Sequence, residues 1–230
     1  MHIKNLQDYF KSFSKIELIL TPILLIIVLG ISIALKDTKV ATFGAVFGLL
    51  YTVFAGKGKV LCYTFGIIST LCYSFLAWQN ALYGALILYL LYYFPMNIIG
   101  IFAWRKNINK ITQTINKIKL DSKQRINILL ITSLFVVVSY CILNYTNDKY
   151  PLMDAITTIF SMTGMYLTVK RSIEQWAAWT VVNVTSCIIW LSIITSGGKT
   201  VATLLSWLIY AFLGIYFYIQ WHKELKTQEI

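Results

Sequence analysis

Two tryptophans and an asparagine follow the spacing W-x2-W-x3-N in the stretch EQWAAWTVVN, at Trp176, Trp179 and Asn183. At about 100° per residue of α-helix, these three side chains share one face. The same stripe, about 100° wide, also includes Gln175, Ser186 and Trp190. Indole rings attract cations and stack on flat rings, while amides donate and accept hydrogen bonds. We call this stripe the tryptophan face and expect it to hold a flat organic ligand.

The chain around the tryptophan face is strongly apolar. Of its 230 residues, 58% are hydrophobic and 15% aromatic, whereas 13% are charged. A water-soluble surface needs about twice that share of charge. The charged residues also gather between apolar stretches of about 16 to 22 residues, which is the length of a helix that crosses a bilayer. The composition therefore predicts an all-α polytopic membrane protein rather than a soluble domain.

Eight apolar stretches are candidates for membrane-spanning helices. They cover residues 16–35, 40–55, 60–78, 83–104, 126–145, 151–169, 174–195 and 200–221. Pro22 and Pro95 lie inside two of them. Membrane helices tolerate proline because neighbouring helices or water satisfy the carbonyl groups that it leaves unpaired.

The placement of the positive charges indicates the membrane topology. The formal net charge is +11, and with eight spans sixteen of the twenty Lys and Arg fall on the side of the N-terminus. The four on the other side are Lys36, Lys39, Lys149 and Lys199. Because Lys and Arg concentrate in cytoplasmic loops, we expect both termini in the cytoplasm and no nucleic-acid partner.

A weak internal repeat, at an offset of about 113 to 117 residues, divides the chain. A first three-helix repeat covers residues 40–107 and ends in AWRK, and a second covers residues 151–223 and ends in QWHK. We expect an N-terminal cytoplasmic segment and extra helix over residues 1–36, a basic loop and linker helix over 108–145, and a cytoplasmic tail over 224–230. The core is then a 3+1+3 parallel repeat, in which the substrate binds between the halves near the middle of the membrane.

Two explanations of the tryptophan face other than ligand binding stay open. Tryptophan is common where helices meet the membrane surface, and Trp176 and Trp190 lie near the two ends of the apolar stretch. Asn183 lies near its centre, where an amide needs hydrogen-bond partners that a neighbouring helix can also supply. The register of the repeat favours a ligand, because an offset of 113 places Tyr63, Gly66 and Thr70 opposite the motif. An aromatic face present in one half only suits an asymmetric ligand.

The predicted span interiors contain no carboxylate, histidine or lysine. Asp154 and Glu174 lie at span ends, and His2 and His222 lie outside the spans. The four cysteines are scattered, with no C-x-x-C spacing. Since proton relays and most ion-coupled sites use charged groups, we expect uncoupled facilitated diffusion, without enzymatic activity, metal or cofactor.

Further motifs connect the chain with a known family. The W-x2-W-x3-N motif, preceded by Lys170 and Arg171 and then by Glu174 and Gln175, resembles the signature of PnuC-type vitamin transporters. Similar to that family are also KGK at 57–59, LYG at 82–84, YYFPMNIIG at 92–100 and WRKN at 104–107. The resemblance covers about residues 40–223, and its strength lies in the combination of motifs.

The resemblance implies both a fold and a transport activity. It implies a 3+1+3 core related to the SWEET sugar transporters, in the cytoplasmic (inner) membrane of a bacterium. It also implies downhill uptake of nicotinamide riboside by alternating access, with a cytoplasmic riboside kinase that traps the vitamin by phosphorylation. Thiamine or another small vitamin or nucleoside remains an alternative substrate.

We expect Trp179 and Asn183 to be the principal substrate contacts, followed by Trp176 and Gln175. The remaining residues expected along the substrate path are Ser186, Trp190, Tyr73, Tyr93 and Asn97. Ordinary aromatic packing is the alternative for the two tyrosines. Small residues four positions apart, such as Gly44 and Gly48, allow close helix packing within one chain or between the copies of a homo-oligomer.

Overall fold

The computed structural model describes residues 12–146, 148–197 and 201–228. The first part of the expected N-terminal segment, the end of the expected tail, and the positions of His2 and Lys199 lie outside the described residues. Within the described ranges the regular secondary structure is helical, apart from two isolated β-bridges. The all-α class is therefore confirmed.

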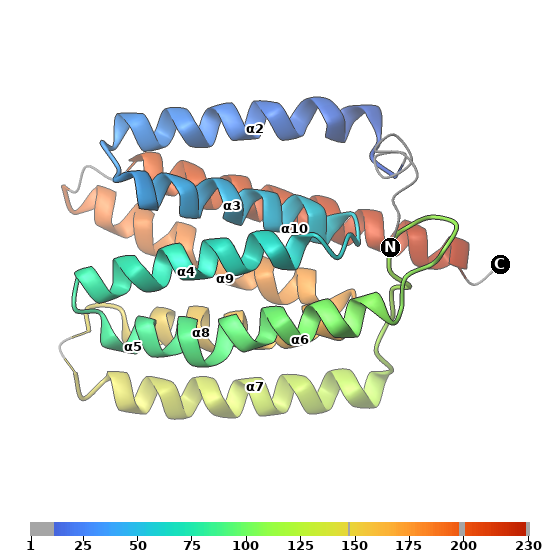
Figure 1. The fold of residues 1–230 in the computed structure, drawn as a ribbon. Helices are drawn as coiled ribbons and strands as arrows, with labels where there is room; N and C mark the ends of the chain where they lie inside the picture. Colours follow the sequence, from blue (N-terminus) through green and yellow to red (C-terminus); the bar gives the residue numbers. More distant parts are fainter. Residues whose placement is uncertain (1–11, 147, 198–200, 229–230) are drawn as a thin grey trace. The chain divides into compact units, whose positions relative to one another are not determined.

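The chain divides into two compact units, the first ending at Asn116 and the second beginning at Lys117. The helices of the first unit are α2 (Lys15–Ala34), α3 (Lys39–Gly56), α4 (Cys62–Gln79), α5 (Tyr83–Ile87), the π-helix η1 (Leu88–Tyr93) and α6 (Phe94–Arg105), drawn blue to green in Figure 1. In this unit α2 packs on α3, α3 on α4, and α4 on the continuous segment formed by α5, η1 and α6.

The second unit repeats this order of packing. Its helices are α7 (Ser122–Leu143), α8 (Pro151–Val169), α9 (Glu174–Thr195) and α10 (Val201–Gln228). Here α7 packs on α8, α8 on α9, and α9 on α10. In each unit, therefore, a central helix that packs on both neighbours, α4 or α9, is followed by the unit's last helical segment.

The described helices lie close to the eight predicted stretches but differ at two ends. α7 begins four residues earlier than predicted, because Asp121 and Gln124 form a capping box ahead of the apolar residues. α10 continues past residue 221 as far as Gln228, beyond the apolar stretch. Apolarity marks the part of a helix that fits a bilayer, whereas caps and polar turns decide where the helix ends.

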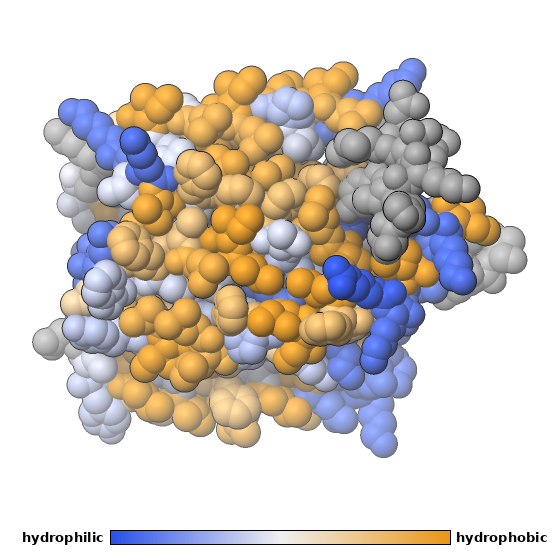
Figure 2. Space-filling model, viewed as in Figure 1, coloured by the Kyte–Doolittle hydropathy of each residue, from blue (hydrophilic) through white to orange (hydrophobic). Residues whose placement is uncertain are grey.

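Seven helical segments in the described ranges are long and apolar enough to cross a membrane. They are α2, α3, Tyr83–Arg105, α7, α8, α9 and Thr203–Lys226. The remaining predicted span, α4, has sufficient length but lower apolarity, since it contains the buried Ser69, Thr70 and Ser74. Figure 2 shows hydrophobic residues along the visible sides of α2 and α7. The protein is a multi-pass membrane protein.

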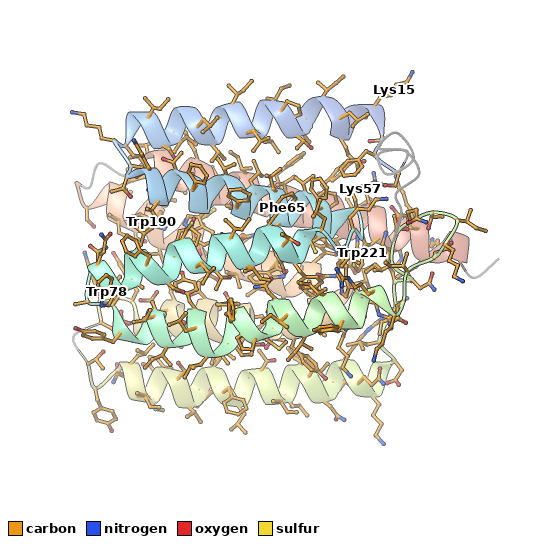
Figure 3. All side chains as sticks on the ribbon, in the orientation of Figure 1. Lys15, Lys57, Phe65, Trp78, Trp190 and Trp221 are labelled. Atoms are coloured by element: carbon orange, nitrogen blue, oxygen red, sulfur yellow. The ribbon has the colours of Figure 1, made fainter. Side chains whose placement is uncertain are left out.

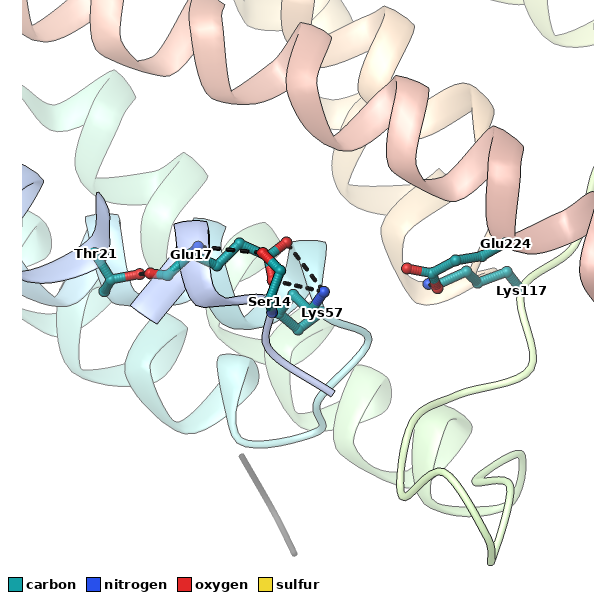
Figure 4. A network of polar contacts seen from close by, with 6 residues as sticks. All are labelled: Ser14, Glu17, Thr21, Lys57, Lys117 and Glu224. Carbon is teal, nitrogen blue, oxygen red and sulfur yellow. Dashed lines mark hydrogen bonds and ion pairs between the residues drawn. The ribbon is translucent and has the colours of Figure 1, made fainter. Parts of the chain in front are cut away.

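An ion pair fixes the first turn of α2 to the end of α3. Glu17 completes a capping box with Ser14, and its carboxylate lies 2.9 Å from Lys57 Nζ (Figure 4). Both side chains are buried, and Figure 3 places Lys57 at the same end of this unit as Lys15. Removing one partner of such a pair would leave an uncompensated buried charge, which costs about 3–5 kcal/mol.

The segment before Pro95 is a π-helix rather than the continuous α-helix that the apolar stretch predicts. Proline has no N–H to donate to the carbonyl four residues earlier, so the helix must adjust in the preceding turn. η1 provides this adjustment over Leu88–Tyr93. Single π-turns of this kind occur often at functional sites.

The turns after α3 and α8 have the same backbone geometry. Gly58 and Arg171, 113 positions apart, adopt φ angles of 64° and 62°, in the left-handed region. Each carbonyl accepts a hydrogen bond from the loop between α6 and α7: Ile115 N donates to Gly58 O and Ile118 N to Arg171 O, both at 3.0 Å. Each unit thus holds part of this loop against its turn.

An aromatic pair also recurs at the equivalent positions of the two units. Tyr63 of α4 meets Trp104 of α6 edge to face at 4.9 Å and 81°. Trp176 of α9 meets Trp221 of α10 at 5.7 Å and 81°. Together with the turns, these pairs support our proposal that residues 40–107 and 151–223 are two copies of one three-helix repeat.

Gly100 provides the first test of this packing, because a Cβ atom there would lie 2.2 Å from the buried ring of Tyr63. We expect Gly100→Ala to destabilise the protein by about 1–3 kcal/mol through overpacking. Gly30→Ala is the matched control, since nothing lies within 4 Å of its added methyl group. Thermal unfolding in detergent measures both variants, and equal midpoints would contradict the packing described here.

Lys59 provides a second test, in the loop after α3. Its Nζ donates to Gln113 O at 3.1 Å, and burial, together with the nearby Lys57, lowers its pKa from 10.5 to about 8. Between these two values the unfolded chain binds more protons than the folded one, so folding becomes more stable as pH rises. Lys59→Met should remove this increase in folding stability with pH.

The measurement is the unfolding midpoint of detergent-purified protein at about pH 7.5 and about pH 9.5, on either side of the lowered pKa. Lys110→Met, on the exposed surface of the same loop, is the matched control and should keep the wild-type pH dependence. An unchanged pH dependence in Lys59→Met would show that Lys59 does not titrate in this window.

Candidate functional site

The tryptophan face lies on α9, between α8 and α10 of the second unit. Gln175, Asn183 and Ser186 are 1%, 7% and 5% exposed. On the opposite side of the helix, Val184 and Ile188 are 45% and 46% exposed. The polar side of α9 therefore faces the interior of its unit, and the aliphatic side faces outward.

Trp176 is enclosed by aromatic rings of α10. Its ring centroid lies 5.2 Å from that of Phe217 and 5.7 Å from that of Trp221, and only 3% of the residue is exposed. Its indole Nε1 is buried and has no hydrogen-bond partner in the described chain. This burial argues against a membrane-surface role for Trp176. Trp190, which Figure 3 shows toward the other end of the unit from Trp221, is partly exposed and suits that role better.

Trp179 packs across the face of α8. Its Nε1 donates to Thr168 Oγ1 at 3.3 Å, and the Thr168 hydroxyl donates to Gly164 O at 2.8 Å. A Cβ atom at Gly164 would lie 2.9 Å from the indole ring, so the glycine makes room for it. The edge of the ring is thus held by α8. Neither α8 residue could be predicted from the sequence, because their contacts depend on tertiary packing.

The amides of the tryptophan face have no hydrogen-bond partners within the described chain. Gln175 Nε2 and Oε1 are both buried and unpaired. Asn183 makes no side-chain hydrogen bond to any described residue, and neither does Ser186. An unsatisfied buried polar group costs about 1–3 kcal/mol. The interhelical hydrogen bond that was the alternative explanation for Asn183 is therefore absent from the described residues.

In the first unit the candidate residues form a row along η1 and α6. The ring of Tyr89 lies 6.0 Å from that of Tyr73 and 5.9 Å from that of Tyr93. One turn further, Asn97 Nδ2 donates to Tyr93 O at 2.8 Å and to Thr70 Oγ1 at 3.4 Å, while Asn97 Oδ1 is buried and unpaired. Tyr89 was not among the residues predicted from the sequence, although Tyr89, Tyr93 and Asn97 follow one another at helical intervals of four.

At two pairs of equivalent positions, one unit has a glycine where the other has a large or polar side chain. Gly66, which corresponds to Trp179, lies under Asn97, because a Cβ atom there would be 2.2 Å from Asn97 Oδ1. Gly214, which corresponds to Asn97 at an offset of 117, faces Thr180 and Asn183. The first unit therefore offers an amide from its last helix, and the second an indole and an amide from its central helix.

Charged groups near the tryptophan face are paired at the start of α9. Glu174 accepts from Arg125 Nε at 2.8 Å and from Leu120 N at 3.3 Å, and it also bonds the Ser172 hydroxyl. No group of three or more His, Cys, Asp or Glu that could bind a metal occurs in the part of the chain that the structure describes. The arrangement offers aromatic surface and neutral hydrogen-bonding groups.

Comparison with known proteins gives the family. Residues 38–223 match the family model described as nicotinamide mononucleotide transporter. The match begins at the N-cap of α3 and therefore leaves out α2.

Named relatives and a solved structure agree with this match. The chain is 33% identical to the nicotinamide riboside transporter PnuC of Neisseria mucosa, over 83% of this chain and 74% of that protein. It is 24% identical to the transporter of the same name from Haemophilus influenzae, over 96% and 95% of the two chains. A crystal structure of the vitamin B3 transporter PnuC matches with a TM-score of 0.79 and 28% identity, over 96% of each chain. The chain thus belongs to the nicotinamide mononucleotide transporter family, whose members are transporters and not enzymes, as its motifs predicted.

Proposed function

We propose that this protein takes up nicotinamide riboside by facilitated diffusion. The names of its relatives support this substrate, since the similar proteins of Neisseria mucosa and Haemophilus influenzae are both called nicotinamide riboside transporters. The observation that carries the proposal is the set of unpaired polar groups on α9: both polar atoms of Gln175, the indole N–H of Trp176 and the amide of Asn183. A ligand with its own donors and acceptors would satisfy them.

The chemistry of nicotinamide riboside suits these groups. Its pyridinium ring is flat and positively charged, and an indole face attracts such a cation with about 1–2 kcal/mol when both are desolvated. Its carboxamide and ribose hydroxyls can bond to the amide of Asn183 and to Gln175. In this proposal Trp179 and Asn183 are the main contacts, followed by Trp176 and Gln175, and Ser186, Trp190, Tyr73, Tyr93 and Asn97 line the path.

The transport cycle in this proposal is alternating access without a coupled ion. Ion-coupled transporters use ionisable groups inside the membrane, and the spans of this chain have none in their interiors. The π-helix η1 before Pro95 provides a local irregularity at which a helix can bend during the cycle. A cytoplasmic kinase that phosphorylates the riboside would trap it and keep the inward gradient.

The proposed location is the cytoplasmic membrane of a bacterium, with both termini in the cytoplasm. The positive charges support this orientation, because the loop between α6 and α7 and the turns after α3 and α8 are all basic. Thiamine is the alternative substrate. Competition between labelled nicotinamide riboside and unlabelled thiamine in vesicles separates the two, since a thiamine transporter would be inhibited by thiamine at low concentration.

Trp179→Ala tests the aromatic contact. We expect the purified variant to fold but to lose measurable binding and uptake of nicotinamide riboside, because the ring face that attracts the pyridinium is gone. Trp78→Ala is the matched control, since Trp78 is 62% exposed at the end of α4 and is not one of the proposed contacts. Uptake of labelled riboside into vesicles is the measurement. Wild-type uptake by correctly folded Trp179→Ala protein would refute this contact.

Asn183→Leu tests the amide, since leucine has a similar size but no hydrogen-bonding atoms. Loss of one hydrogen bond to the ligand should raise the dissociation constant about tenfold. Thermal stability without ligand should not fall, because Asn183 bonds no described residue. Tryptophan fluorescence titration and thermal unfolding give the two values. Lower stability with unchanged affinity would make Asn183 a structural residue instead.

A further inference from the structure

The loop between α6 and α7 is held to the second unit by its backbone. Ile118 N donates to Arg171 O, and Ile173 N donates to Ile118 O, each at 3.0 Å. Ile118 and Ser172 form an isolated parallel bridge. Two residues later Leu120 N donates to the carboxylate of Glu174. Hydrogen bonds from the main chain of this part of the loop therefore fix its position at the start of α9.

This anchored loop directs Lys117 onto the end of α10. Lys117 is 5% exposed, and its Nζ forms an ion pair with Glu224 (Figure 4). The same Nζ lies 4.8 Å from the ring centroid of Trp221, within the range of a cation–π contact. A lysine placed between a carboxylate and an indole ring fixes the position of that ring.

Trp221 in turn supports the tryptophan face. It is fully buried, and its ring meets that of Trp176 edge to face at 5.7 Å. Trp176 has no hydrogen bond from its indole N–H in the described chain, so ring contacts with Trp221 and Phe217 hold it in place. A continuous series of contacts thus runs from Lys117 through Trp221 to Trp176.

We propose that Lys117 is a positioning residue for the ligand: by fixing Trp221 it orients Trp176, although it does not touch the ligand itself. This inference rests on the proposed function, because Trp176 belongs to the proposed binding face. It gives the basic loop a role in affinity in addition to its role in membrane topology.

The test compares Lys117→Met with Lys119→Met. Methionine keeps the length and apolar stem of lysine but removes the charge that binds Glu224 and Trp221. Lys119 lies two residues further along the same loop, is exposed and makes no side-chain hydrogen bond or ion pair with any described residue, so its variant is the matched control. Binding of nicotinamide riboside is followed by tryptophan fluorescence, and uptake into vesicles gives KM and the maximal rate separately.

We expect Lys117→Met to raise the dissociation constant and KM about three- to tenfold, with the maximal rate within about twofold of wild type. Lys119→Met and Lys117→Arg, which keeps a cation over Trp221, should both bind like wild type. Equal affinities of folded Lys117→Met and wild type would overturn the positioning role alone. A wild-type protein that does not bind nicotinamide riboside would overturn the proposed function, and this inference with it.

Glu224→Gln gives an independent test if Lys117→Met does not fold. The Glu224 side chain is 39% exposed, so its replacement opens no buried cavity. Without the carboxylate the ammonium group loses its ion pair with residue 224, and the dissociation constant should rise about two- to fourfold. Wild-type affinity in Glu224→Gln, together with a Lys117→Met protein that fails to fold, would make Lys117 a purely structural residue and overturn the inference.

Discussion

A side-chain amide inside a membrane-spanning helix is stable only when another group meets its hydrogen bonds. Two buried hydroxyl groups meet this requirement through carbonyl groups: Ser69 donates to a carbonyl of α3, and Thr168 donates to one in its own helix. Gln175 and Asn183 have no such partner among the described residues. In the proposed function, a bound ligand supplies the missing partners of these two amides.

The charges of the protein serve a different purpose. Lys57 with Glu17 and Lys117 with Glu224 each join a turn or loop to the end of a helix (Figure 4), and Arg125 with Glu174 joins the first turn of α7 to the start of α9. These pairs fix the ends of the helices and leave the interiors of the spans neutral. In the proposed function, aromatic rings attract the cationic ligand without a charged residue as counter-ion.

The helices and the family could be predicted from the sequence, because apolar length and motif spacing are local properties. The π-helix before Pro95 and the early start of α7 could not, since they depend on backbone adjustment and capping. The contacts of Thr168 and Gly164 with Trp179 could not be predicted either, because they depend on the packing of α8 on α9. Gly44, expected to mediate helix contacts, packs on Cys72 and Tyr73 within its own unit. The 3+1+3 arrangement and the relation to SWEET transporters stay predictions.

The most direct test of the account is an experimental structure with nicotinamide riboside bound in a lipid environment. The account predicts the pyridinium ring against the face of Trp179 and a polar atom of the riboside within about 2.7–3.2 Å of the Asn183 amide. A riboside bound away from α9, or an Asn183 amide turned toward the acyl chains, would contradict it.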